Sequence, residues 1–242
     1  MTLGARILDS IWPRRCEACQ RPVDRPGRHL CTECLNRIPF VPTDGLCRVC
    51  GRSVDDLHGG YLCEDCSRTA TAPAFDRAGS AFRFEGTARR MLLDYKFNRH
   101  LWLRDDFTDW LEAAVRARFD PAAIDVVVPM PVTVFHRIDR GYNQSAYLAE
   151  ALSKRIDRCF EGRVLKRTGH PRRQAELTED ERRENAKGTF AVRAPALVRG
   201  RTVLVVDDVM TTGSTLSAAA EALKSAGARR VWCVTLARSI RG

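Results

Sequence analysis

Four pairs of cysteines with the spacing Cys-x2-Cys stand near the start of the sequence. They are Cys16/Cys19, Cys31/Cys34, Cys47/Cys50 and Cys63/Cys66. Two thiolates separated by two residues in a tight turn can ligate one ion, and two such turns complete the tetrahedron that zinc prefers. Disulfides are the competing interpretation, but they need an oxidising compartment, and the N-terminal sequence lacks the long apolar stretch of a signal peptide. The spacing therefore predicts zinc sites in a reducing, cytoplasmic setting.

The cysteine pairs also repeat, and the repeat indicates how they combine. The sequence CEACQRPVD from Cys16 resembles CRVCGRSVD from Cys47, and a Leu-Cys-x2-Cys turn follows each of them. If each repeat is a self-contained unit, each repeat binds one ion. The two ligand sets are then Cys16, Cys19, Cys31 and Cys34, and Cys47, Cys50, Cys63 and Cys66. An interleaved cross-brace is the alternative. Four protein thiolates leave no open position for a substrate, so both ions are expected to be structural.

A second group of chemically capable residues lies in VLVVDDVMTTGST, residues 203–215. Four apolar residues predict a buried strand, the carboxylates of Asp207 and Asp208 follow it, and a Thr/Gly/Ser loop precedes a helix from Ser214. Such a loop directs backbone N–H groups and hydroxyls at one point, where the helix N-terminus adds positive potential, so it suits a phosphate group. The two carboxylates repel a phosphate and suit two adjacent hydroxyl donors beside it.

Apolar stretches and helical patterns alternate after about residue 73, which is typical of an α/β domain. The predicted strands are 78–84, 125–131, 201–208 and 229–237, and helices are predicted to begin at Thr87, Leu101, Asn143 and Ser214. Short, strongly apolar strands separated by helices indicate a mostly parallel sheet covered on both faces, with ligands at the carboxyl ends of the strands. We therefore expect two parts, a small cysteine-rich zinc-ribbon module at residues 1–72 and an α/β domain at residues 73–242.

Residues 203–215 resemble the phosphoribosyl pyrophosphate signature of class I phosphoribosyltransferases, in which four apolar residues and two acids precede a Thr-Thr-Gly phosphate loop. The resemblance implies the fold of that class, with a flexible hood, and a site for phosphoribosyl pyrophosphate with magnesium. It implies that Asp207 and Asp208 hold the ribose. The residues it assigns to the 5′-phosphate are Thr211, Thr212, Gly213, Ser214 and Thr215.

In proteins of this class a second loop holds the pyrophosphate group, and here it is expected after the predicted strand 125–131. Its candidate residues are Arg137, Arg140 and Gly141. The chain departs at this point from many members of the class, because prolines flank Met130 and a longer loop replaces the usual short one.

Other segments are similar to the ComF family, which joins an N-terminal cysteine module to this fold. They are RGYNQS at 140–145, YKF at 95–97, and Gln174, Leu177, Arg182, Asn185 and Phe190. The family is linked to natural competence, the uptake and handling of incoming single-stranded DNA. By this resemblance the charged segment 166–189 is the hood, with Gln174, Arg182 and Arg183 as candidates for closing on the ligand.

These resemblances imply two classes of function. The first is an enzyme that transfers a phosphoribosyl group, either to an unknown acceptor or to a base in nucleotide salvage. The second is a non-catalytic nucleic-acid-binding module that retains the phosphoribosyl pyrophosphate site, with single-stranded DNA and other competence proteins as partners. The formal charge of +10 suggests anionic partners such as phosphates or nucleic acid, but an Arg-rich composition can also reflect genomic base bias, so charge alone does not decide between the classes. Membrane insertion is not expected, because no apolar stretch approaches the roughly 20 residues that span a bilayer.

Metal analysis of the purified protein is expected to find about two zinc ions per chain, one for each set of four thiolates. The cysteine-rich segment is too short and too poor in large apolar residues to fold unaided, so metal binding supplies much of its folding free energy. Inductively coupled plasma mass spectrometry gives the zinc content directly. A metal-free protein that keeps the same fold would contradict this prediction.

Overall fold

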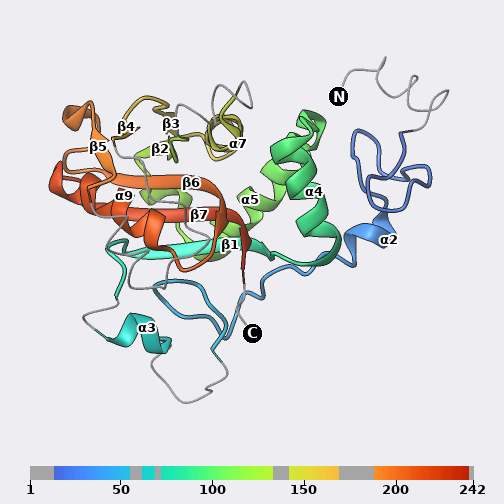
Figure 1. The fold of residues 1–242 in the computed structure, drawn as a ribbon, viewed down its shortest axis with the longest axis horizontal. Helices are drawn as coiled ribbons and strands as arrows, with labels where there is room; N and C mark the ends of the chain where they lie inside the picture. Colours follow the sequence, from blue (N-terminus) through green and yellow to red (C-terminus); the bar gives the residue numbers. More distant parts are fainter. Residues whose placement is uncertain (1–13, 55–61, 69–71, 133–141, 169–187, 240–242) are drawn as a thin grey trace.

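The strongly apolar segments of the chain lie side by side in one parallel sheet. The computed structural model describes residues 14–54, 62–68, 72–132, 142–168 and 188–239. The strands of this sheet are β1 (Arg77–Arg83), β2 (Val126–Pro129), β3 (Cys159–Phe160), β6 (Thr202–Met210) and β7 (Arg230–Arg238). They pair in the order β1-β7-β6-β2-β3, and each of these pairings is parallel (Figure 1). The predicted α/β class is confirmed.

Helices cover both faces of the sheet, as the continuous apolar sequence of its strands requires. The helices are α4 (Gly86–Phe97), α5 (Arg104–Arg118), α7 (Gln144–Arg155) and α9 (Ser214–Ser225). Side chains of β6 alternate between the faces. Leu204 and Val206 belong to the buried cluster that includes α4, α5 and α7, whereas Val203 and Val205 belong to the cluster that includes α9.

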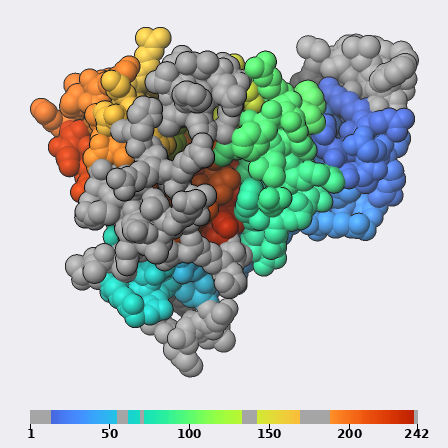
Figure 2. All heavy atoms as spheres, in the orientation of Figure 1, coloured from blue at the N-terminus to red at the C-terminus, as the bar shows by residue number. Residues whose placement is uncertain are grey.

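The two groups of cysteines lie against opposite faces of this sheet. Cys16, Cys31 and Cys34 are buried in the cluster that contains α4, α5 and α7. The second group, with Cys47, Cys50 and Cys63, is buried in the cluster that contains α9. Figure 2 shows the two groups as separate blue and cyan surfaces, the blue one beside the green helices. Each group therefore contributes to the core on its own side.

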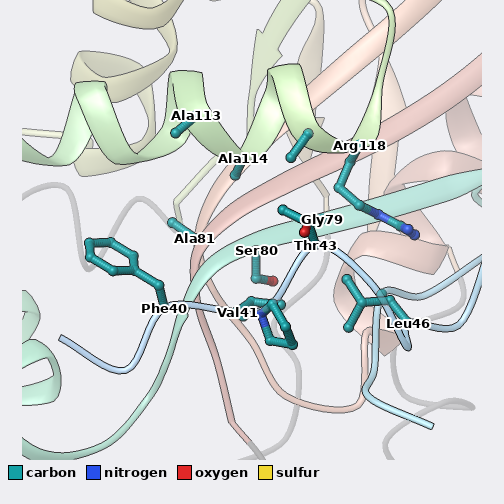
Figure 3. A pocket seen from close by; sticks show the side chains of 13 residues that line it. Phe40, Val41, Thr43, Leu46, Gly79, Ser80, Ala81, Ala113, Ala114 and Arg118 are labelled. Atoms are coloured by element: carbon teal, nitrogen blue, oxygen red, sulfur yellow. The ribbon is translucent and has the colours of Figure 1, made fainter.

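The segment between the two cysteine groups pairs with the outer edge of β1. Val41 N donates to Ala81 O at 2.9 Å, and Arg83 N donates to Pro39 O at 2.8 Å. This pairing covers a strand edge that would otherwise expose unpaired backbone groups. A cavity of about 140 Å³ remains between the segment, β1 and α5, walled by small side chains that include Gly79, Ala81 and Ala114 (Figure 3).

The structure also contains short elements that the sequence pattern does not predict. They are α2 (Thr32–Leu35), α3 (Glu64–Ser67), β3, the antiparallel pair β4 (Leu165–Arg167) and β5 (Phe190–Val192), and the 3-10 turns η1 (Leu101–Leu103), η2 (Pro121–Ala123) and η4 (Pro195–Leu197). Each has too few residues to establish a hydrophobic period. The helix predicted from Leu101 begins as η1 and becomes α-helical at Arg104. Among the described residues, no helix is both long enough and apolar enough to cross a bilayer.

Candidate metal centres and phosphate site

The structure brings the cysteines together in two groups of four, in the sequential combination. We call Cys16, Cys19, Cys31 and Cys34 the first cluster, and Cys47, Cys50, Cys63 and Cys66 the second cluster. Within each cluster the sulfur atoms lie within 4.8 Å of one another. Tetrahedral zinc with Zn–S bonds of about 2.3 Å places its sulfurs about 3.8 Å apart, and Cys19 Sγ lies 3.8 Å from Cys31 Sγ. The donor set and its spacing therefore fit zinc.

The first cluster is held against α5 and η1 by polar contacts. The backbone N and the Nδ1 of His29 each lie 3.1 Å from Oδ2 of Asp106, whose side chain is buried on α5. Arg28 forms an ion pair with Asp109 one turn further on. Trp102 Nε1 donates to Glu17 Oε1 at 2.7 Å. Sequence reasoning missed these contacts, because they join segments more than 70 residues apart.

The predicted phosphate loop follows β6 and leads into α9. Gly213 has φ of 83°, a left-handed conformation that favours glycine, and its carbonyl accepts the hydrogen bond of Ser217 N. Thr212 Oγ1 accepts from Ser214 N at 3.3 Å and donates to Ser214 Oγ at 3.0 Å. The N-terminus of α9, whose first N–H groups lack partners within the helix, opens at this loop. The local geometry suits an anion.

The two predicted carboxylates lie at the end of β6, next to this loop. Asp207 Oδ1 accepts hydrogen bonds from Ser145 Oγ at 3.0 Å and from Asp208 N at 2.9 Å. Asp208 Oδ2 forms an ion pair with Lys96 Nζ at 2.7 Å. Removal from water and the adjacent charge of Asp208 raise the pKa of Asp207 to about 7, although the Asp208 N–H, Lys96 and Ser145 act in the opposite direction. Asp207 is thus poised to exchange a proton near neutral pH.

Lys96 and Ser145 reach the carboxylates because α4 and α7 are joined to each other at this end of the sheet. Gln144 Nε2 donates to Lys96 O at 3.1 Å, and Tyr142 OH donates to Tyr95 O. Asn143 caps α7 through Ser145 N, at 3.1 Å, and binds Met130 O beyond β2. The motifs YKF and RGYNQS contain most of these residues, so the sequence marks the segments without revealing their contacts with the carboxylates.

Several predicted site residues lie outside the described part of the chain. They are the pyrophosphate-loop candidates Arg137, Arg140 and Gly141 and the hood candidates Gln174, Arg182 and Arg183. Their roles stay predictions. The described strands β4 and β5 flank the expected hood, and Arg167 of β4 lies over the Phe190 ring, 5.5 Å from its centroid. Burial lowers the pKa of Arg167, and the charge of Asp207 partly offsets that effect.

Comparison with known proteins finds matches to both parts of the chain. A family model described as double zinc ribbon domain matches residues 7–67, and one described as phosphoribosyl transferase domain matches residues 143–242. Competence protein F of Haemophilus influenzae is 27% identical over 93% of this chain and 97% of its own length. DNA utilization protein YhgH of Escherichia coli K12 is 27% identical over 92% and 96%. Adenine phosphoribosyltransferase of Mycobacterium marinum is 46% identical over 22% of this chain and 29% of its own length.

The raised pKa of Asp207 predicts how its contribution to stability depends on pH. Between about pH 4 and pH 7 the folded chain keeps a proton on this carboxyl that the unfolded chain releases, so stability falls as pH rises through this window. The free energy of unfolding of the wild type, minus that of Asp207→Asn, is therefore expected to decrease from pH 5 to pH 7.5. Taking the difference removes the pH dependence of the shared groups that do not interact with Asp207.

Urea titrations of both proteins at several pH values measure this difference. Carbon-13 NMR of the aspartate carboxyls provides a direct check, because the resonance missing from Asp207→Asn should titrate near pH 7 in the wild type. A difference in stability that is independent of pH would contradict the prediction.

Proposed function

We infer that this chain belongs to the competence protein F family and carries a phosphoribosyl transferase domain. On this premise we propose that the carboxyl end of β6 binds phosphoribosyl pyrophosphate with magnesium. The observation that supports the proposal is that Asp207 and Asp208 lie near the carboxyl end of β6, and that the loop following this strand leads into the N-terminus of α9. Two acceptors next to an anion site match a ribose 5-phosphate, which has two adjacent hydroxyls and a phosphate at its other end.

In this proposal the 5′-phosphate lies in the loop, and Asp207 and Asp208 accept hydrogen bonds from the ribose hydroxyls. The loop residues are Thr211, Thr212, Gly213, Ser214 and Thr215. Magnesium would neutralise charge on the diphosphate, and these oxygen-rich surroundings suit its preference for hard ligands. Lys96, which pairs with Asp208, is a described cation at this site that would orient a bound group.

The chemistry that such a site supports is displacement at the anomeric carbon of the sugar. A nucleophile forms a bond to that carbon while the carbon–oxygen bond to the diphosphate breaks, and the diphosphate leaves with the electron pair. The contribution of the protein is positioning and charge stabilisation. We propose Arg137, Arg140 and Gly141 for the leaving group, and Gln174, Arg182 and Arg183 for the hood that excludes water.

We further propose that each cysteine cluster binds one zinc ion and that the chain divides into residues 1–72 and 73–242. The spacing of the sulfurs and the double zinc ribbon match support zinc. With four thiolates each, these ions would stabilise the fold and leave no position open for a substrate.

Replacing both carboxylates should abolish binding of the sugar phosphate without unfolding the protein. We expect Asp207→Ala combined with Asp208→Ala to weaken binding of magnesium and phosphoribosyl pyrophosphate at least about 100-fold, since hydrogen bonds to charged groups contribute most strongly to affinity. Isothermal titration calorimetry of the zinc-loaded protein measures this affinity. Asp105→Ala, an exposed carboxylate on α5, is the matched control, and unchanged binding by the double variant would refute the site.

Binding of single-stranded nucleic acid is a second candidate function, and three exposed aromatic side chains favour it. Phe97 is 57% exposed, Trp102 47% and Tyr147 42%. Arg99 and Arg104 lie in the same short stretch of chain as the first two. Exposed rings among cations are the elements with which proteins stack bases and hold a phosphate backbone. The names competence protein F and DNA utilization protein, which the relatives carry, agree with this function.

If these rings stack on bases, Phe97→Ala should weaken binding of a fluorescein-labelled oligothymidylate by about 5- to 100-fold in fluorescence anisotropy. Phe40→Ala is the matched control, because Phe40 is also an exposed phenylalanine but lies on the segment between the cysteine clusters. Affinity should fall steeply with salt for all variants, because phosphate contacts release counterions. Equal losses in the two variants would rule out stacking at Phe97.

A further inference from the structure

The second cluster is linked through intermediate residues to both ends of the predicted phosphate loop, whereas the first cluster lies on the other face of the sheet. The loop begins after Met210, the last residue of β6, and ends where α9 begins at Ser214. Separate contacts link each of these points to the segment that carries the second cluster. The loop is therefore framed by the same cysteine-rich segment on both sides.

Arg238 makes the contact at the β6 end of the loop. Its side chain is only 4% exposed, and its guanidinium donates to Cys50 O and lies 3.6 Å from Cys50 Sγ. In the sheet Arg238 is the register partner of Met210, and Ser239 N donates to Met210 O at 2.9 Å. A buried guanidinium needs a fixed, electron-rich partner to offset the loss of water. Cys50 supplies that partner, and Arg238 is paired in the sheet with Met210, the residue that immediately precedes the loop.

The residues that follow the second cluster make the contact at the α9 end. Ala74 N donates to Ser217 Oγ in the first turn of α9 at 2.8 Å. The Phe75 ring is buried in the same cluster as Cys47 and Cys50, and a Cβ added to Gly213 would lie 3.5 Å from that ring. Phe75 thus packs directly beneath the glycine on which the loop turns.

We propose that Arg238 is a positioning residue that couples the second cluster to the phosphate loop. Metal bound by this cluster fixes Cys50, and through Arg238 and Phe75 it fixes the two ends of the loop in the conformation that accepts the phosphate. Without the metal the cysteine turn loses the bonds that fold it, and Arg238 loses the fixed position of its partner. This inference rests on the proposed binding of phosphoribosyl pyrophosphate.

Coupling of this kind is reciprocal, because two ligands that strengthen each other must do so by the same factor. Bound phosphoribosyl pyrophosphate should therefore strengthen zinc binding by the second cluster and leave the first cluster unchanged. The first cluster provides an internal control, since its contacts are with α4, α5 and η1.

The experiment uses the wild-type protein loaded with zinc. The protein is brought to equilibrium with a chelator that buffers free zinc, in the presence or absence of magnesium and phosphoribosyl pyrophosphate. A short pulse of N-ethylmaleimide labels the free cysteines, and mass spectrometry follows each cluster separately. We expect the ligand to lower the free zinc concentration at which half of the second cluster is labelled by at least about 5-fold, the lower range of typical coupling between sites. Labelling of the first cluster should not change.

Two variants then test the residue itself. Arg238→Lys is expected to bind about two zinc ions, as the wild type does, but to lose the protection of the second cluster and at least about 5-fold in affinity for the ligand. Arg90→Gln, which removes a hydrogen bond to Ala18 O in the first cluster segment, should change neither quantity. Cysteine labelling measures the protection and calorimetry measures the affinity, both independently of any catalytic activity.

The outcomes separate the two proposals. If calorimetry finds no binding of the ligand to the wild type, the proposed function fails and the coupling fails with it. If the wild type binds the ligand but both clusters or neither are protected, only the coupling is overturned. Full protection in Arg238→Lys would overturn the role of Arg238. Should this variant fail to fold, the labelling of the wild type still decides the coupling.

Discussion

The structure depends on one constraint, that a parallel sheet must be covered on both faces. Strand β6 has buried apolar side chains on both faces of the sheet, so other apolar segments must pack against each face. On one face α4, α5 and α7 provide most of this cover, and on the other face α9 shares the task with β4, β5 and the second cluster. The cysteine clusters are therefore parts of the two cores, and the buried contacts cross the expected boundary at residues 72 and 73.

The same constraint determines where charge can be placed. The interior of the sheet is apolar, and Asp207 and Asp208 lie where β6 leaves it. Asp208 forms an ion pair with Lys96 of α4, and Asp207 accepts a hydrogen bond from Ser145 of α7. A hydrogen bond from Gln144 to the Lys96 carbonyl joins these two helices. Two adjacent acids need such partners, because like charges close together disfavour joint ionisation. Burial, and after it the neighbouring charge of Asp208, still raises the pKa of Asp207.

Much of this arrangement could be predicted from the sequence where a local pattern carries the information. The apolar run before Asp207, the loop before α9 and the repeat of the cysteine turns each lie within a short stretch of chain, and the structure places them as expected. The fold class and the grouping of the cysteines followed from these patterns.

The remaining features depend on contacts between distant segments, for which a single sequence has no signal. In the sequence, Asp106 looks like an ordinary acidic residue in the first turn of a helix. In the structure its buried carboxylate accepts a hydrogen bond from His29, 77 residues away. Arg238 follows an apolar strand and would be taken for a solvated end. Strand β3 forms because its backbone pairs with β2. Its two residues are too few to show the alternation of apolar and polar residues that predicts a strand.

The contact between Arg238 and Cys50 also bears on how the protein is made. The two residues are 188 positions apart in the chain, and at a synthesis rate of roughly 5–20 residues per second the ribosome needs about 10–40 s to cover that interval. During this time the second group of thiols has left the ribosome without the strand against which it will be buried. Until the last strand of the sheet exists, these thiols therefore lack the buried surroundings that they have in the folded chain.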